Sequence, residues 1–264
     1  MVNSYHTHLA FCKHAEGYAE DYIKKAIEFN IKEIGITDHI PVPNYFYDDL
    51  EFKRLNNNTK MDYNEINDYL FDVINVKNKY KNNINVYVGF ECEYYDKIVP
   101  ILNELRPKVD YFVLGIHHYY YENKINTFYN QDDYIRNYGN IAIEALDSKL
   151  FKIFAHPDMF LWGVFGKPFN KLCIEVTRKI CEAAIKNNVY LEINCNKIRE
   201  YLKNGNSFLY PNENFWKIVS EYKDIKVIVS SDAHKPQFLY DEAVKYAYEW
   251  GRKFNLNIVD KIDI

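Results

Sequence analysis

Short apolar runs alternate with longer amphipathic segments along most of this chain. The short runs are rich in β-branched and aromatic residues, which predicts strands, whereas the longer segments repeat apolar positions every three or four residues, which predicts helices. The predicted strands cover residues 3–8, 33–38, 85–91, 111–117, 152–156, 189–194 and 226–232. The predicted helices cover residues 19–29, 64–79, 98–105, 132–146, 172–186, 213–222 and 240–254. This alternation is typical of an α/β fold built on a parallel sheet.

One connecting segment, residues 41–59, is long, polar and rich in asparagine. It follows the second predicted strand. Long loops in compact domains are often functional, so we expect either a lid over a site or a disordered surface loop. Both interpretations stay open at this point.

Length and charge narrow the class of protein. One α/β barrel uses about 250 residues, so 264 residues are expected to form a single domain, 1–264. The formal net charge of -4 argues against a nucleic-acid surface, which is usually basic. No apolar run reaches the roughly 20 residues of a membrane helix, and the first residues lack a signal-peptide pattern, so we expect a cytoplasmic protein without a membrane partner.

The cysteines do not predict a site of their own. None of the 5 cysteines lies in a CxxC pair, so neither a disulfide framework nor a thiolate zinc knuckle is indicated. We expect small thiols that are buried or lie near the site.

The histidines are placed in a pattern that does predict a site. Seven of the 8 lie at the end of a predicted strand or in the loop that follows, and the carboxylates Glu91 and Asp232 end two of these strands. The carboxyl ends of parallel strands meet on one rim of a barrel, so these side chains should converge. A single such histidine would be explained by structural hydrogen bonds. Seven on one rim favour a metal, because neutral imidazoles and carboxylates suit zinc, manganese and iron, and burying them alone leaves costly unsatisfied groups.

Eight short motifs carry a family resemblance. They are HTH at 6–8, FCKHA at 11–15, GITDHIP at 35–41, GFE at 89–91, GIH at 115–117, AHPD at 155–158, EIN at 192–194 and SSDAH at 230–234. The set resembles the polymerase and histidinol phosphatase (PHP) superfamily over nearly the whole chain, and most of all its stand-alone histidinol-phosphate phosphatases. The resemblance implies a distorted (β/α)7 TIM-like barrel with three divalent metal ions in its mouth.

The resemblance also implies which residues bind these metals. The first metal would take His6, His8, Glu91 and Asp232. The second would share Glu91 and add His117 and His156, and the third would take His14, His39 and His234. A carboxylate has two oxygens and can bridge two cations, which suits the shared role of Glu91. Zinc, manganese and iron all remain compatible with such ligands.

The implied reaction is hydrolysis of histidinol phosphate to histidinol and phosphate in histidine biosynthesis. We expect a hydroxide that bridges the first two metals to attack phosphorus, with Glu91, Asp232 and His234 as catalytic residues. Asp232, with His234 nearby, is the candidate proton route to the leaving group. The alternatives are another small phosphomonoester, a nucleotide or a phosphotyrosine peptide as substrate, a metal-loaded domain without catalysis, and an amidohydrolase-type barrel.

Three further residues are candidates for binding substrate. Arg199 lies where the family often has an arginine that clamps phosphate, although a surface pair with Glu200 would also explain it. Glu93 could orient a metal-bound histidine, recognise an ammonium group or be exposed. His118 could line the pocket or face solvent. The family usually has an aromatic residue at the position of His118 and a glycine at that of Lys197, so the identity of the leaving alcohol stays open.

Overall fold

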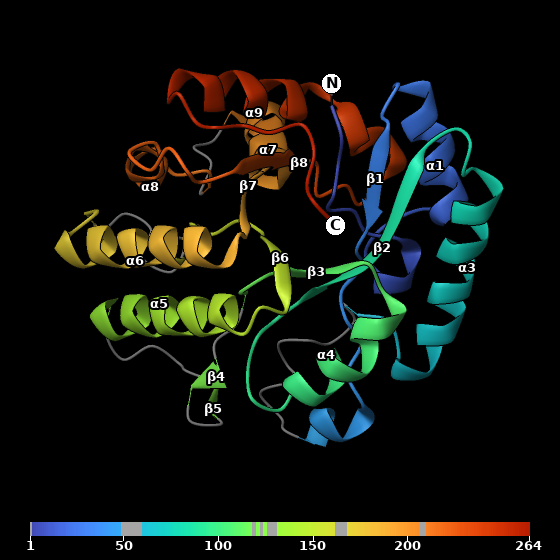
Figure 1. Cartoon of the computed structure of the whole chain (residues 1–264), viewed down its shortest axis with the longest axis horizontal. Coiled ribbons are helices and arrows are strands. Elements are labelled where there is room, and N and C mark those ends of the chain that lie inside the picture. Colours follow the sequence, from blue (N-terminus) through green and yellow to red (C-terminus); the bar gives the residue numbers. More distant parts are fainter. Residues whose placement is uncertain are drawn as a thin grey trace.

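Six strands form one curved sheet in the computed structural model, which describes residues 2–48, 60–117, 120–121, 124–125, 131–161, 168–205 and 210–264. The strands are β1 (Glu33–Ile36), β2 (Asn85–Cys92), β3 (Tyr111–Leu114), β6 (Phe151–Phe154), β7 (Tyr190–Asn194) and β8 (Val227–Ser230). They pair in parallel in the order β1-β2-β3-β6-β7-β8 (Figure 1). A separate antiparallel pair is formed by β4 (Tyr120–Tyr121) and β5 (Lys124–Ile125). The predicted α/β barrel class is confirmed.

The segment predicted as the first strand joins the two edges of this sheet. Ser4 pairs with Ile34 of β1, and Thr7 pairs with Ala233 just after β8. The backbone N–H of His8 donates to the carbonyl of Ala233 at 2.9 Å. These are isolated bridges to two different neighbours, so the predicted continuous strand at 3–8 is wrong in this detail. The segment nevertheless links β1 and β8 and carries its side chains into the barrel.

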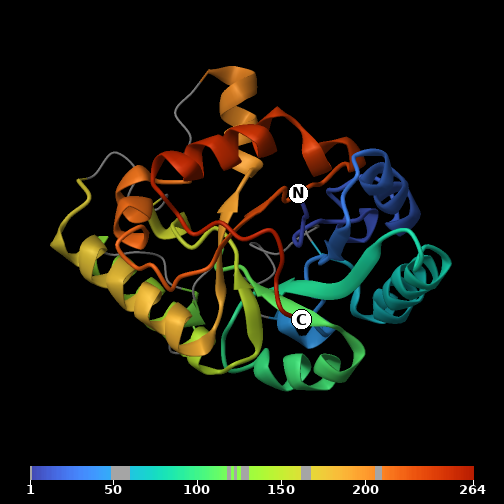
Figure 2. The same ribbon diagram turned by 45° about the horizontal axis from the view of Figure 1, so that its top comes forward.

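Helices cover the outside of the sheet (Figures 1 and 2). They are α1 (Ala19–Glu28), α3 (Ile66–Lys79), α4 (Val99–Leu105), α5 (Gln131–Asp147), α6 (Lys171–Asn187), α7 (Asn196–Asn204), α8 (Glu213–Val219) and α9 (Glu242–Lys253). Short 3-10 turns lie at Ala10–Cys12, Asn44–Asp48, Tyr63–Glu65, Arg106–Lys108, Met159–Leu161 and Pro236–Tyr240. The amphipathic pattern predicted seven of these helices and missed α7.

Buried side chains pack the helices against the strands of the sheet. Residues of β1, β3 and β8 are buried throughout, as expected for strands covered on both faces. The Tyr69 hydroxyl of α3 lies 2.9 Å from the Ile36 carbonyl and 2.8 Å from the Gly89 carbonyl, so it ties α3 to the ends of β1 and β2. Gly35 is needed for packing, because a Cβ there would lie 1.8 Å from the Tyr111 hydroxyl oxygen.

Several strands end earlier in the structure than the sequence predicted. β3 stops at Leu114, β6 at Phe154 and β8 at Ser230, so the histidine or aspartate that follows each lies beyond the end of its strand. His156 and Asp232 have positive φ angles of 35° and 45°. Such values are uncommon for residues with a Cβ and often mark functional sites.

Two sequence predictions lie wholly or largely outside the described residues. His118 is one of them, and most of the 41–59 segment is the other, since the structure describes that segment only up to Asp48. Within the described ranges, no helix is both long and apolar enough to cross a bilayer.

Candidate metal centre

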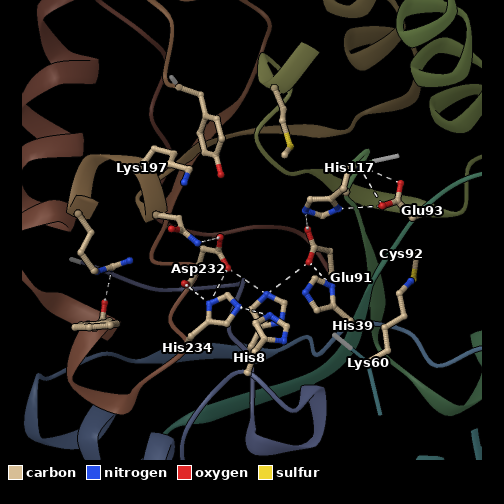
Figure 3. Close-up of a pocket in the computed structure, with 17 residues that line it drawn as sticks. His8, His39, Lys60, Glu91, Cys92, Glu93, His117, Lys197, Asp232 and His234 are labelled. Atoms are coloured by element: carbon tan, nitrogen blue, oxygen red, sulfur yellow. Dashed lines mark hydrogen bonds and ion pairs between the residues drawn. The ribbon is translucent and has the colours of Figure 1, made fainter. Parts of the chain in front are cut away.

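The residues that follow the strands enclose a cavity of about 480 Å³ at the carboxyl-end rim (Figure 3). Seven of the nine predicted ligands line it, namely His8, His14, His39, Glu91, His117, Asp232 and His234. The other two, His6 and His156, are buried and contact Glu91. Side chains from the whole length of the chain therefore meet in one place, as the strand-end pattern predicted.

The four residues assigned to the first metal form a compact group. His6 Nε2 and His8 Nε2 lie 3.1 Å apart, and His8 Nε2 lies 3.1 Å from Asp232 Oδ1. Glu91 Oε2 lies 3.5 Å from the Nε2 atoms of both His6 and His8. These separations suit side chains that share one cation.

Glu91 also reaches the group assigned to the second metal. Its other oxygen, Oε1, lies 3.2 Å from His156 Nε2 and 3.6 Å from His117 Nε2. The two carboxylate oxygens thus face two different pairs of imidazoles, which is the arrangement a bridging ligand requires.

Of the three histidines assigned to the third metal, two lie close together and the third lies farther away. His14 Nε2 and His234 Nε2 lie 3.0 Å apart. His39 turns toward the bridging carboxylate instead, with its Nδ1 2.9 Å from Glu91 Oε2, and its ring centroid lies 5.3 Å from that of His14. His14 and His234 form a close pair, and His39 lies between that pair and Glu91.

Hydrogen bonds on the outer nitrogens leave lone pairs directed inward. His6 Nδ1 lies 2.9 Å from Glu192 Oε2, His14 Nδ1 lies 2.8 Å from the Cys12 carbonyl, and His234 Nδ1 lies 3.1 Å from the Asp232 carbonyl. Since these acceptors need a proton on Nδ1, the Nε2 atoms carry lone pairs. In the pair of His14 and His234, two such nitrogens face each other at 3.0 Å, which is a stable arrangement only around a cation or a shared proton.

Incompletely satisfied buried polar atoms also indicate that the cluster binds a cation. Within the described part of the chain, His8 Nδ1, His156 Nδ1 and Asp232 Oδ1 are buried and make no hydrogen bond of good geometry, although His8 Nδ1 lies 3.5 Å from Asp38 Oδ1 and Asp232 Oδ1 lies 3.1 Å from His8 Nε2. Buried polar atoms normally have partners, so this cluster is incomplete as a purely structural network. The donor set of imidazoles and carboxylates fits divalent transition metals.

The charges of the cluster are strongly coupled. Burial alone would raise the pKa values of Glu91 and Asp232, but the surrounding imidazoles, His6 foremost, hold both well below the usual range. Burial opposes protonation of His6 as well, yet Glu192 and Glu91 raise its pKa well above the ordinary value. Burial lowers the pKa of His234 to about 3, with repulsion from the neighbouring imidazole of His8. The carboxylates are therefore ionised at neutral pH.

Two further carboxylates hold imidazoles in place. Glu93 accepts hydrogen bonds from the His117 backbone N–H at 3.1 Å and lies 3.0 Å from His117 Nδ1. Of the roles considered for Glu93, orienting this histidine is the one the contacts support. Glu192 of β7 does the same for His6, and Asn194 donates to Glu192 at 2.7 Å and to Asp232 at 3.2 Å. The EIN motif was noticed in the sequence, but this function of Glu192 was missed.

Arg199 lines the cavity but is already engaged. Its guanidinium pairs with Asp241 and donates to the carbonyls of Ser231 at 3.1 Å and Phe238 at 3.2 Å. The expected alternative, a surface pair with Glu200, is wrong, because Glu200 pairs with Lys197. A role in clamping phosphate stays a prediction.

Sequence reasoning missed several residues that line the cavity, among them Lys60 and Tyr210. Lys60 is only 8% exposed, and burial lowers the pKa of its ammonium group. Tyr210 is buried, with its ring centroid 5.7 Å from that of His156. No sequence signal distinguished them, since Lys60 ends an asparagine-rich segment and Tyr210 is one of 25 tyrosines.

A family model for the PHP domain matches residues 4–196. The chain belongs to the PHP family. Two curated relatives of this PHP protein carry the name "Probable histidinol-phosphatase". The one from Schizosaccharomyces pombe is 32% identical over 122 residues, 45% of this chain and 39% of that protein. The one from Deinococcus radiodurans is 21% identical over 260 residues, 91% of this chain and 90% of that protein. The yeast match thus spans less than half of that relative's length.

The fold of this PHP protein is similar to that of a solved structure. It is the histidinol phosphate phosphatase of Lactococcus lactis subsp. lactis in complex with zinc, L-histidinol and phosphate. The match has a TM-score of 0.70 and 16% sequence identity, and it covers 100% of this chain and 99% of that one. At this identity the likeness concerns the fold, and it confirms the TIM-like barrel expected from the sequence.

Proposed function

We propose that this PHP protein is a metal-dependent phosphatase that hydrolyses histidinol phosphate to histidinol and phosphate. The observation that carries the proposal is the convergence of seven imidazoles with Glu91 and Asp232 around one cavity. Membership of the PHP family and the names of the two curated relatives support the phosphatase class and the substrate. The substrate would place the protein in histidine biosynthesis.

We propose three divalent metal positions, held by the nine residues assigned above. Zinc, manganese and iron all suit the imidazole and carboxylate ligands, and zinc is present in the Lactococcus lactis structure. When bound, such ions lower the pKa of an attacking water and offset charge on the phosphoryl oxygens. Phosphate monoesters need this help, because their uncatalysed hydrolysis is among the slowest reactions that enzymes accelerate.

The protein's own residues would supply the remaining functions. Glu91 holds two imidazole groups in a fixed relation, since each of its oxygens faces one group. Asp232 and His234 form the proposed proton route to the leaving alcohol, because His234 Nδ1 lies 3.5 Å from Asp232 Oδ1. Arg199 and Glu93 are proposed to act at the substrate side of the cavity, Glu93 through His117. A cavity of about 480 Å³ suits a small phosphomonoester.

A steady-state assay of phosphate release tests this function. Purified protein loaded separately with Zn²⁺, Mn²⁺ or Fe²⁺ is given histidinol phosphate, a nucleoside monophosphate, phosphotyrosine and a simple alkyl phosphate. We expect the highest kcat/KM with histidinol phosphate. A higher kcat/KM with another ester would show that histidinol phosphate is not the preferred substrate but would keep the phosphatase function. If no ester released phosphate, the proposed phosphatase function would be refuted.

A further inference from the structure

Cys12 lies beside the third proposed metal position and has no part in the function argued so far. It ends the 3-10 turn Ala10–Cys12 between His8 and His14, and its side chain is fully buried. Its Sγ is 4.0 Å from His14 Nε2. The Sγ atom and one ring nitrogen each of His14 and His234 all lie within 4.8 Å of one another.

The two imidazoles of this group direct lone pairs to the same point. The Nδ1 atoms of His14 and His234 face backbone carbonyls, at 2.8 and 3.1 Å, so the Nε2 atoms are free to bind. Their separation of 3.0 Å leaves room for one ion held by both. Cys12 adds a donor atom to this pair, and His39, the third imidazole assigned to this position, has a ring nitrogen within 4.8 Å of one of His234.

A second buried group beside the thiol is incompletely satisfied. His8 Nδ1 makes no hydrogen bond of good geometry within the described residues and faces Asp38 Oδ1 at 3.5 Å, and one ring nitrogen of His8 lies within 4.8 Å of Cys12 Sγ. A thiol is a weak hydrogen-bonding group, so it does little to satisfy such a site by itself. The surroundings of Cys12 are those of a ligand cluster and differ from an apolar core, where buried cysteines usually pack.

We propose that Cys12 binds a metal ion through its sulfur, together with His14 and His234. The inference rests on the metal-dependent function proposed above and gives the third position a ligand of a different kind from the first two. A zinc–sulfur bond of about 2.3 Å and a zinc–nitrogen bond of about 2.1 Å together span more than the separation of Cys12 Sγ and His14 Nε2, so one ion reaches both. The thiol proton passes to solvent as the sulfur–metal bond forms.

The sulfur ligand makes the three positions chemically unequal. Thiolates select zinc over manganese, whereas imidazole and carboxylate groups accept several divalent metals. The third position would therefore prefer zinc even in a protein whose other positions hold manganese. Selectivity of this kind is a property of the residues at 12, 14 and 234 and does not depend on the substrate.

Cobalt substitution tests the proposal by absorption spectroscopy, without reference to turnover. Co²⁺ is titrated into the metal-free full-length protein, because cobalt gives visible d–d bands with any ligand and a near-ultraviolet charge-transfer band only with sulfur. We expect that band in the wild type and its loss in Cys12→Ser. Cys92→Ser is the matched control, since Cys92 is also buried and lines the same cavity, but its Sγ contacts the Phe90 carbonyl at 3.5 Å.

Several outcomes of the cobalt titration would contradict the proposal. A sulfur band that persists in Cys12→Ser, or one that disappears in Cys92→Ser alone, overturns the assignment. Visible cobalt bands without a sulfur band in the wild type refute the sulfur ligand and leave the metal centre in place. No cobalt bands of any kind refute the metal-dependent function as well.

A second measurement covers the case in which the serine variant does not fold. Zinc-edge X-ray absorption of the wild-type holoenzyme should contain a sulfur scatterer at about 2.3 Å. Only nitrogen and oxygen scatterers would overturn the proposal. In the folded variant we expect zinc affinity at one position per chain to fall by roughly 10- to 100-fold or more, because even residues outside the ligand set have effects of this size.

Discussion

Individual carboxylates around the cavity have distinct tasks that their contacts define. Glu91 and Asp232 face the centre, whereas Glu93 and Glu192 face the outer nitrogens of His117 and His6. An acceptor on Nδ1 fixes the proton there and leaves Nε2 available for a metal. Removing the charge of an inner carboxylate and that of an outer one should therefore have different effects.

Asp232→Asn should abolish phosphate release. The amide keeps the size of the side chain but loses the charge that faces the imidazoles of His6 and His8. Turnover and bound metal per chain are measured together, with Glu175→Gln on the exposed surface as control. Activity near that of the wild type at full metal content would remove Asp232 from the proposed machinery.

Glu93→Gln should lower metal retention and kcat by roughly 10- to 100-fold, the usual cost of losing an orienting partner. A neutral amide holds the His117 ring less firmly than the carboxylate does. Metal content after dialysis against a mild chelator and steady-state kinetics report the effect, and Glu104→Gln, a carboxylate in an exposed pair with Lys108, serves as control. Unchanged retention would mean that Glu93 acts on the substrate instead.

At the scale of elements, Arg199 joins α7 to the start of α9. Arg199 of α7 pairs with Asp241, the residue that caps α9 by accepting from the Val244 N–H at 3.2 Å. The same guanidinium donates to the carbonyl of Ser231, directly after β8, and to that of Phe238 in the 3-10 turn Pro236–Tyr240. Arg199 thus fixes three elements at the cavity rim as well as being a candidate phosphate ligand.

Arg199→Lys should raise KM severalfold and lower the free energy of unfolding by about 1.5–3 kcal/mol, the range for hydrogen bonds to charged groups. Lysine keeps the charge but cannot reproduce the planar fork. Kinetics and urea unfolding separate the two effects. Asp241→Asn breaks the same ion pair while keeping a capping side chain, so a KM change shared by both variants would show that the arginine acts through position and not by binding phosphate.

Hydrophobic periodicity predicted most elements because their burial is regular. It missed α7, a helix of nine residues in which Ile198 is the one buried residue and Leu202 is exposed. It extended β3 and β8 too far, since Ile116 and Ser231, which follow these strands, are as buried as strand residues are. The strand-end histidines were found because parallel topology brings carboxyl ends together. The contact of Glu192 with His6 could not be found, because it depends on how the 3–8 segment packs against β7 in the folded barrel.

At the scale of the whole molecule, the cluster couples metal binding to protons. The pKa values of His6, His8 and His117 are raised in the metal-free protein: burial lowers each of them, but neighbouring carboxylates outweigh it. A metal must displace these protons, because it binds the neutral imidazole. A raised pKa means that the proton stays bound above the ordinary histidine value of about 6.5, so protons compete with metal in that range.

Metal should therefore stabilise the protein more at about pH 8 than at about pH 6. Stabilisation by metal is expected to increase with pH, because protonated imidazoles stabilise the metal-free fold at low pH. This contribution of the protons is lost as pH rises through the raised pKa values. Thermal unfolding with and without saturating Zn²⁺ measures the difference in Tm, and chelation should remove it. A Tm increase from metal that is larger at the lower pH would contradict the proposed imidazole ligands.

The bridge between the 3–8 segment and β8 also governs the order in which the molecule can assemble. Ser4 and Ser231, whose hydroxyls lie 2.8 Å apart, are separated by 227 positions. A nascent chain on the ribosome exposes His6 and His8 long before Asp232 has been synthesised, and domains close only when distant partners are available. The edge of the 3–8 segment that contacts Ala233 therefore has no partner until the last part of the chain has been made. The first and third proposed metal positions can be completed only after Asp232 and His234 have been synthesised, whereas the ligands proposed for the second, Glu91, His117 and His156, all precede β8.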